Sequence, residues 1–239
     1  MGQGVAWAAK ELGVPCTVTV PDYAPETKVS AMERLGARVI KKPFDEWWNA
    51  IEESRVEGVE GLFLHPVENE QVIAGNGTIG LEILEDLPDP DVVLIPFGGG
   101  GLTTGIASAL RAERPETRIY AVEQDTAAPL NATLEAGTMQ AIDYQQSFID
   151  GAGAKALLPK MWGLVEPLID GAYRVSLDEV ASAIRVLAER PRVVAEGAGA
   201  LAPAAALSGR AGEGRIVCIV SGGNIDFPVL SRILAGETP

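Results

Sequence analysis

The sequence predicts an α/β protein in which parallel-rich sheets are flanked by helices. Short apolar runs typical of buried strands alternate along the chain with segments whose apolar residues recur at helical spacing. Two parallel strands need a crossover connection, so this alternation favours parallel pairing. With 239 residues and 47% hydrophobic residues, the chain is long enough to bury a sizeable core in one large or two modest domains.

The first expected domain is a small α/β layer over residues 1–69. Apolar positions in residues 5–12 predict a helix that ends at Gly13, followed by a strand at residues 16–20. The same order repeats with a helix at residues 28–35 and a strand that begins at Arg38. A third helix near Asp45 and a third strand at residues 62–64 complete this domain.

The second expected domain, residues 70–239, is larger and carries the clearest strand. A helix at residues 72–84 leads to residues 91–97, whose unbroken apolar run indicates a strand buried on both faces. Ser176 and Glu179 have the spacing of a capping box at a helix start. Further helices are expected at 102–112, 177–188 and 200–207, and further strands at 118–122 and 215–220.

Composition narrows the partners and the compartment. A formal net charge of −14 disfavours nucleic acid as a partner, because binding phosphates needs clustered Lys and Arg. No stretch approaches the ~20 apolar residues that cross a bilayer, so no membrane association is expected. Cys16 and Cys218 lie in apolar runs typical of buried, reduced thiols, which predicts a cytoplasmic protein. Small molecules or other protein chains are the expected partners.

The strongest local motif is the run Gly98, Gly99, Gly100 and Gly101 between a buried strand and the helix that begins near Leu102. Glycines let backbone N–H groups converge on an anion, and the dipole of the following helix adds to the attraction. A flexible loop is the alternative interpretation. Neither the lysine and serine of a P-loop nor the dinucleotide-binding spacing follows, so a nucleoside triphosphate is not expected.

Two further motifs are less specific. Ser221 begins a Ser-Gly-Gly-Asn run at the predicted carboxyl end of a strand, where its hydroxyl can bind a ring nitrogen of a cofactor or cap a helix. Glu196 precedes a run of small residues. That pattern favours a helix start, with the carboxylate near the positive end of the helix, over a catalytic acid.

Taken together, these motifs resemble the threonine dehydratase and serine racemase family. The chain begins with Gly-Gln-Gly, which is similar to the end of that family's Ser-(Ala or Ser)-Gly-Asn-His-(Ala or Gly)-Gln-Gly segment. The other similar segments follow in the family's order: 65–66, 72–78, the tetraglycine run 98–102, Asp150-Gly151, Glu-Gly-Ala-Gly-Ala-Leu at 196–201, and Ser-Gly-Gly-Asn-Ile-Asp at 221–226.

This resemblance implies the fold type II architecture of the pyridoxal-phosphate enzymes and a reaction in which threonine or serine loses water and then ammonia. It also implies the role of each matching residue. Gly98, Gly99, Gly100, Gly101 and Leu102 would hold the phosphate of pyridoxal 5'-phosphate through backbone amides. Ser221 would face the pyridine nitrogen, Gly151 would approach the phenolic side of the cofactor, and Glu196 would lie near the ring edge.

The resemblance also implies what the chain lacks. The family's catalytic lysine, which forms the Schiff base with the cofactor, lies upstream of the Ser-Gly-Asn segment and is absent here. We assign no catalytic residue, and we expect an N-terminally truncated chain that is inactive alone. It would associate with the missing segment or form a homo-oligomer. A serine racemase-type enzyme and a non-catalytic paralogue that binds an anion or a partner chain remain alternatives.

A cation site is the last feature that the resemblance raises. Glu123 and Ala127 match positions that bind a divalent cation in serine racemases, but Pro129 stands where that pattern needs a carboxylate. Such a cation requires oxygen ligands. We therefore predict no metal site.

Overall fold

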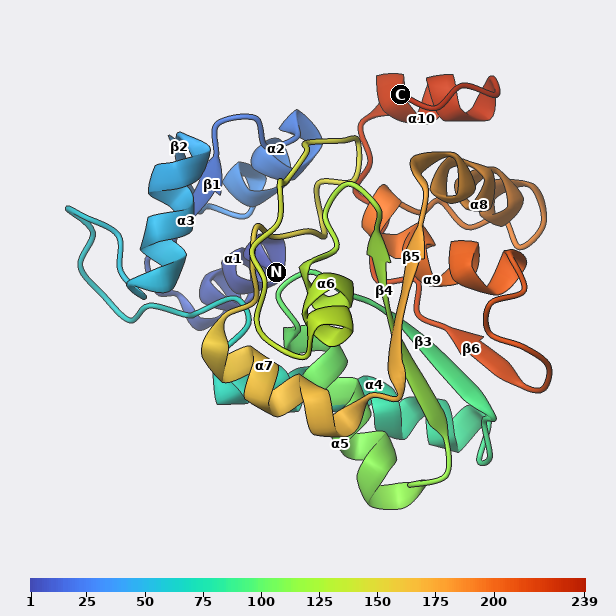
Figure 1. Ribbon diagram of the computed structural model, residues 1–239. Helices are drawn as coiled ribbons and strands as arrows, with labels where there is room; N and C mark the ends of the chain where they lie inside the picture. The colour runs from blue at the N-terminus through green and yellow to red at the C-terminus, as the bar shows by residue number, and fades with distance from the viewer. The chain divides into compact units, whose positions relative to one another are not determined.

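The computed structural model describes residues 1–239 and divides into two compact units, Met1–Pro66 and Val67–Pro239 (Figure 1). Both units contain parallel strands flanked by helices, which confirms the predicted α/β class. None of the helices combines the length and the apolar character that crossing a bilayer requires.

Unit 1 is a two-stranded parallel sheet with three helices. The elements are α1 (Gly2–Leu12), β1 (Thr17–Pro21), α2 (Glu26–Arg34), β2 (Arg38–Lys42) and α3 (Phe44–Glu52). Its small core contains Ala6, Met32 and Ala37. The predicted strand at residues 62–64 is wrong: the segment pairs with no strand, and Leu62 is 87% exposed.

Unit 2 is built on a four-stranded parallel sheet in the order β5-β4-β3-β6. The strands are β3 (Val92–Pro96), β4 (Arg118–Gln124), β5 (Gly171–Val175) and β6 (Ile216–Cys218). The helices are α4 (Glu70–Asp86), α5 (Gly101–Glu113), α6 (Pro129–Ala136), α7 (Pro159–Val165), α8 (Leu177–Glu189), α9 (Gly197–Leu207) and α10 (Phe227–Leu234), with a short 3-10 turn, η1 (Glu166–Leu168), before β5.

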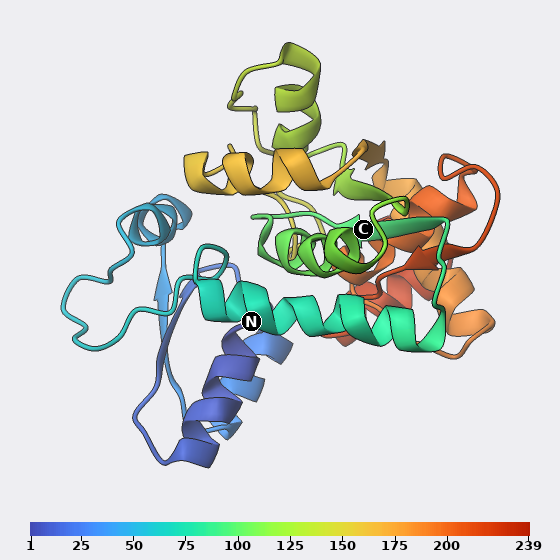
Figure 2. The same cartoon turned by 90° about the horizontal axis from the view of Figure 1, so that it is seen from below.

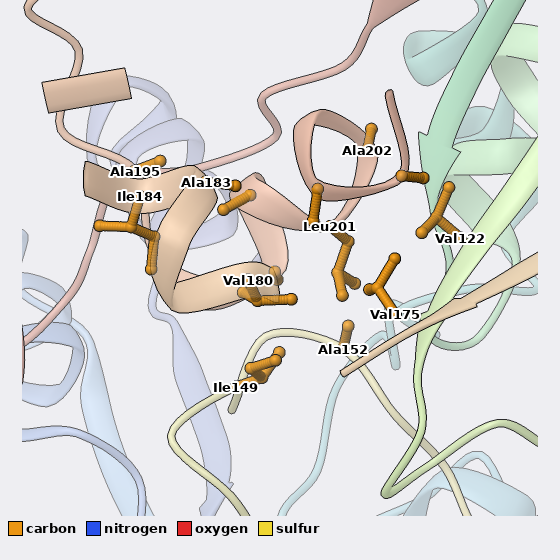
Figure 3. Packing of buried hydrophobic residues seen from close by; sticks show 14 of the residues in the cluster. Val122, Ile149, Ala152, Val175, Val180, Ala183, Ile184, Ala195, Leu201 and Ala202 are labelled. Atoms are coloured by element: carbon orange, nitrogen blue, oxygen red, sulfur yellow. The ribbon is translucent and has the colours of Figure 1, made fainter. Parts of the chain in front are cut away.

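The central strand β3 is buried on both faces, as its apolar run predicts. Side chains alternate between the faces of a strand, so Val92 and Leu94 pack toward α8 and α9, whereas Val93 and Ile95 pack toward α4 and α5. Figure 2 shows α4 and α5 running side by side. Figure 3 shows Leu201 of α9 within the core on the opposite face.

Local signals set several element ends. The predicted capping box is present at the start of α8: Glu179 N donates to Ser176 Oγ, and Ser176 N donates to the Glu179 carboxylate. The predicted strand at 215–220 is shorter, because β6 pairs with β3 only from Ile216 to Cys218. Neither cysteine is fully buried, although burial raises the pKa of the Cys218 thiol to about 11 and keeps it protonated at neutral pH.

Arg111 ties α5 to the start of β4 and to the turn before β5. Its guanidinium donates to the backbone oxygens of Leu168, Pro115 and Thr117 at 2.8–2.9 Å and to Asp170 Oδ2 at 2.7 Å. The same Asp170 oxygen accepts the Ile119 N–H at 2.7 Å. One side chain therefore satisfies three carbonyl groups where three elements converge.

We expect Arg111→Met to lower the free energy of unfolding by about 2–3 kcal/mol, because it leaves those carbonyl groups without their donors. Urea denaturation measures the change. The control Arg232→Met removes one exposed ion pair with Glu237 and should cost less than about 0.5 kcal/mol. Equal losses in the two variants would contradict this role for Arg111.

Candidate functional site

The predicted site residues lie at the carboxyl edge of the unit 2 sheet, where open α/β sheets bind ligands. The tetraglycine turn, Gly98–Gly101, comes directly after β3, and Ser221 comes after β6. Because all strands are parallel, these turns emerge at the same edge. Ser221 is exposed, and Leu102 is half-buried on the first turn of α5.

The start of α5 has no side-chain cap. Its N-cap residue is Gly100, which has a positive φ of 94° and no side chain to accept the orphan N–H groups. The first backbone hydrogen bond of this helix runs from Thr104 N to Gly100 O at 2.8 Å. In contrast, Asn69 caps α4 and Ser176 caps α8. The amides of the first turn of α5 thus suit an oxyanion.

The glycines of this turn are packed from behind. A Cβ atom at Gly99 would lie 2.4 Å from Val67 Cγ1, and one at Gly101 would lie 3.0 Å from Val67 Cα. A Cβ atom at Gly98 would lie 3.2 Å from Ala152 Cα. Side chains here would displace the turn, which is held by its neighbours and is not a free loop.

Glu196 joins two other predicted segments. Its carboxylate oxygen Oε1 would lie 3.1 Å from a Cβ atom at Gly151 and 2.5 Å from one at Gly222, and its backbone N donates to Gly222 O at 3.0 Å. The side chain is buried and precedes α9 without capping it. The structure therefore brings Gly151, Glu196 and the Ser221–Gly222 turn together.

The predicted residues form one connected set. Ala152 and Gly153 lie against Gly98, and their neighbour Gly151 lies against Glu196, which contacts the turn after Ser221. Two residues near the set, Gln124 and Val67, were not predicted. Gln124 ends β4 and is buried, while Val67 supplies the surface behind Gly99 and Gly101. A polar residue at the carboxyl end of a predicted strand was the only sequence signal for Gln124.

Glu123 does not offer the donor set of a cation site. Both of its carboxylate oxygens accept N–H groups: Oε1 from Leu130 N at 3.0 Å, and Oε2 from Asn131 N and Asn131 Nδ2 at 2.8 Å. These donors turn their positive ends toward the carboxylate. Pro129 supplies no oxygen side chain, so the residues do not fit a divalent cation that needs several oxygen ligands.

Burial dominates the electrostatics of Glu123. Desolvation raises its pKa from an ordinary value of 4.5 to about 7, although the N–H donors of Asn131 and Leu130 act in the opposite direction. The folded state binds this proton more tightly than the unfolded chain does. The stability from this group is therefore full below about pH 4.5 and is lost as the pH rises to about 7.

We expect the free energy of unfolding of the wild type to fall, relative to Glu123→Gln, by up to about 3 kcal/mol across this pH range. The glutamine has the same shape and does not titrate, so the difference between the two proteins isolates Glu123. Urea denaturation at several pH values measures it. Parallel pH profiles for the two proteins would show that Glu123 has an ordinary pKa.

Comparison with known families gives a consistent result. A family model described as "Pyridoxal-phosphate dependent enzyme" matches residues 1–222. The chain is 41% identical over 236 residues to the L-threonine ammonia-lyase of Thermotoga maritima and 39% identical to that of Geobacter sulfurreducens. Each alignment covers 97% of this chain but 58% of the relative, so the chain spans about 58% of their length.

Solved structures agree with the sequence comparison. Maize serine racemase superimposes with a TM-score of 0.84 at 31% identity, covering 98% of this chain and 74% of that protein. A threonine deaminase from T.th. gives a TM-score of 0.83 at 34% identity, covering 95% and 75%. The fold type II architecture implied by the sequence motifs is thus confirmed.

Proposed function

The chain belongs to the family of pyridoxal-phosphate dependent enzymes, and from this premise we propose that unit 2 holds pyridoxal 5'-phosphate for an ammonia-lyase acting on threonine or serine. The observation that carries the proposal is the uncapped start of α5 behind a packed tetraglycine turn. A phosphate needs convergent N–H donors, and this turn provides them without a competing side chain.

The proposed roles follow from where the residues lie. The backbone amides of Gly98–Leu102 bind the phosphate, and Gly151 lets its segment approach the phenolic side of the ring. When bound, the cofactor draws electrons away from the Cα atom of an amino acid, which is the chemistry that β-elimination requires. The buried Glu196 lies between the Gly151 and Gly222 segments at the ring edge.

Ser221 is proposed to accept or donate a hydrogen bond at the ring nitrogen. A hydroxyl group is neutral, so it does not hold that nitrogen in its protonated form as a carboxylate would. The strength of the electron sink is thereby moderated, which favours elimination chemistry on a β-hydroxy amino acid. Its exposure in unit 2 leaves the hydroxyl accessible to a ligand.

No lysine in the chain is assigned to the cofactor aldehyde. Lys41 and Lys42 pair with Glu26 and Glu46 within unit 1. Lys160 donates to Glu68 O at 3.3 Å, and Lys155 O accepts the Ile142 N–H. The proposal gives the phosphate and ring contacts to this chain and leaves the aldehyde-binding amine unassigned.

A racemase is the second candidate, because maize serine racemase shares the fold at 31% identity over 98% of this chain. Both reactions begin with loss of the Cα proton, and they differ in what leaves afterwards. The protein isolated from its source cell, incubated with L-serine and the cofactor, separates the two. A 2-oxo acid with equimolar ammonia identifies the lyase, whereas D-serine identifies the racemase.

We expect the purified chain to bind pyridoxal 5'-phosphate reversibly, without a borohydride-stable mass increase. Absorbance titration and intact mass measure these two properties. Gly100→Ala should weaken binding at least about tenfold, because a left-handed residue opens α5 and its Cβ atom would lie 3.2–3.4 Å from Val165, Phe97 and Met161. The control Gly163→Ala, where a Cβ atom meets open space, should bind like the wild type.

Two outcomes would contradict the proposal in different ways. A folded chain that does not bind the cofactor excludes the proposed phosphate site. A reduced adduct on one defined lysine shows instead that the chain carries its own aldehyde-binding amine, and Lys155→Arg then tests the lysine nearest in sequence to the Gly151 segment.

A further inference from the structure

Two adjacent residues at the end of β4, Glu123 and Gln124, are each only 1% exposed, and neither has a role in the reaction proposed above. Neighbouring side chains of a strand point to opposite faces, so the pair reaches two different parts of unit 2. A buried polar side chain is costly unless it forms hydrogen bonds. The partners of the pair therefore show what these residues hold in place.

Glu123 holds the start of α6. The N-cap residue of this helix is Ala128, whose side chain cannot accept a hydrogen bond. The carboxylate of Glu123 takes that place, since it accepts the Leu130 and Asn131 N–H groups and the Asn131 side-chain amide at 2.8–3.0 Å. A strand residue thus caps a helix and fixes the intervening loop, residues 125–128.

Gln124 holds the segment that contains Gly151. Its Nε2 atom donates to Ile149 O at 3.4 Å and to Ala152 O at 3.3 Å. Its Oε1 atom is buried and has no hydrogen-bond partner. The side chain is therefore used for its two N–H groups, which connect the ends of residues 149–152 to β4.

The loop fixed by Glu123 and the segment fixed by Gln124 meet at Gly153. This residue has a positive φ of 108°, and a Cβ atom on it would lie 2.9 Å from Ala127 Cβ and 3.1 Å from Gln124 Nε2. Gly153 N in turn would lie 3.3 Å from a Cβ atom at Gly98. The rear of the tetraglycine turn therefore rests on a segment whose position depends on the end of β4.

We propose that Glu123 and Gln124 are positioning residues, which set the tetraglycine turn and the Gly151 segment at their spacing by holding residues 125–128 and 149–153 together at Gly153. The role toward the cofactor rests on the proposed function. The role in holding the two segments does not, because it follows from contacts within unit 2 alone.

Gln124→Met is the sharpest test, because methionine fills a similar volume and donates no hydrogen bond. Hydrogen exchange of the purified chain, followed by mass spectrometry of peptides, reports the local effect. We expect the amides of residues 150–153 to exchange at least about tenfold faster, while those of α8 are unchanged. Gln140→Met is the matched control, since Gln140 Nε2 donates only to Thr138.

Ligand binding separates positioning from general stabilisation. At a temperature where all variants are folded, Gln124→Met and Glu123→Gln should bind pyridoxal 5'-phosphate at least about tenfold more weakly than Gln140→Met and the wild type. Inorganic phosphate serves as a second probe and should show a weakening in the same direction, because the same amides bind it.

Each outcome decides one part of the proposal. Unchanged exchange at residues 150–153 in Gln124→Met overturns the claim that Gln124 holds the segment. Faster exchange with unchanged cofactor affinity overturns the positioning role. A wild type that binds neither probe contradicts the proposed function, while the exchange data still test the hold on the segment. If Gln124→Met does not fold, Gly153→Ala tests the same junction from the other side, with faster exchange and weaker binding expected.

Discussion

The site depends on one electrostatic constraint: a helix that begins without a cap at the end of a buried strand. The first turn of α5 presents backbone N–H groups that no side chain of the chain accepts, because Gly100 occupies the N-cap position. Substituting a residue with an oxygen side chain would satisfy those groups and would also fill the space that an anion needs. The arrangement thus trades stability of the helix end for ligand binding.

The sheet makes this helix start rigid. β3 is buried on both faces, so the position of its last residue, Pro96, is set by packing against helices on either side. The turn that follows contacts Val67 and Ala152 closely enough to exclude any side chain at Gly98, Gly99 and Gly101. At the end of β4, Glu123 and Gln124 fix the neighbouring segments, so the glycine turn is supported by strands on which it does not itself lie.

The sequence predicted those parts of the fold whose signals are local. The apolar run of β3, the capping box at Ser176 and the glycines before α5 each specify one element without reference to the rest. The strand expected at residues 62–64 failed because three apolar residues do not make a strand without a partner. The strand β5, with the sequence Gly-Ala-Tyr-Arg-Val, escaped prediction because its stability comes from pairing with β4. Likewise, the contacts of Glu123 and Gln124 join residues that are 7 to 28 positions apart, which no local pattern reveals.

The most direct test compares the binding of pyridoxal 5'-phosphate with that of pyridoxal, which has the same ring and no phosphate. Isothermal titration of the purified chain with each compound measures the two dissociation constants. If the amides at the start of α5 are the main anchor, pyridoxal should bind at least about a hundredfold more weakly, a difference of about 3 kcal/mol. Equal affinities for the two compounds would contradict the claim that the tetraglycine turn binds phosphate.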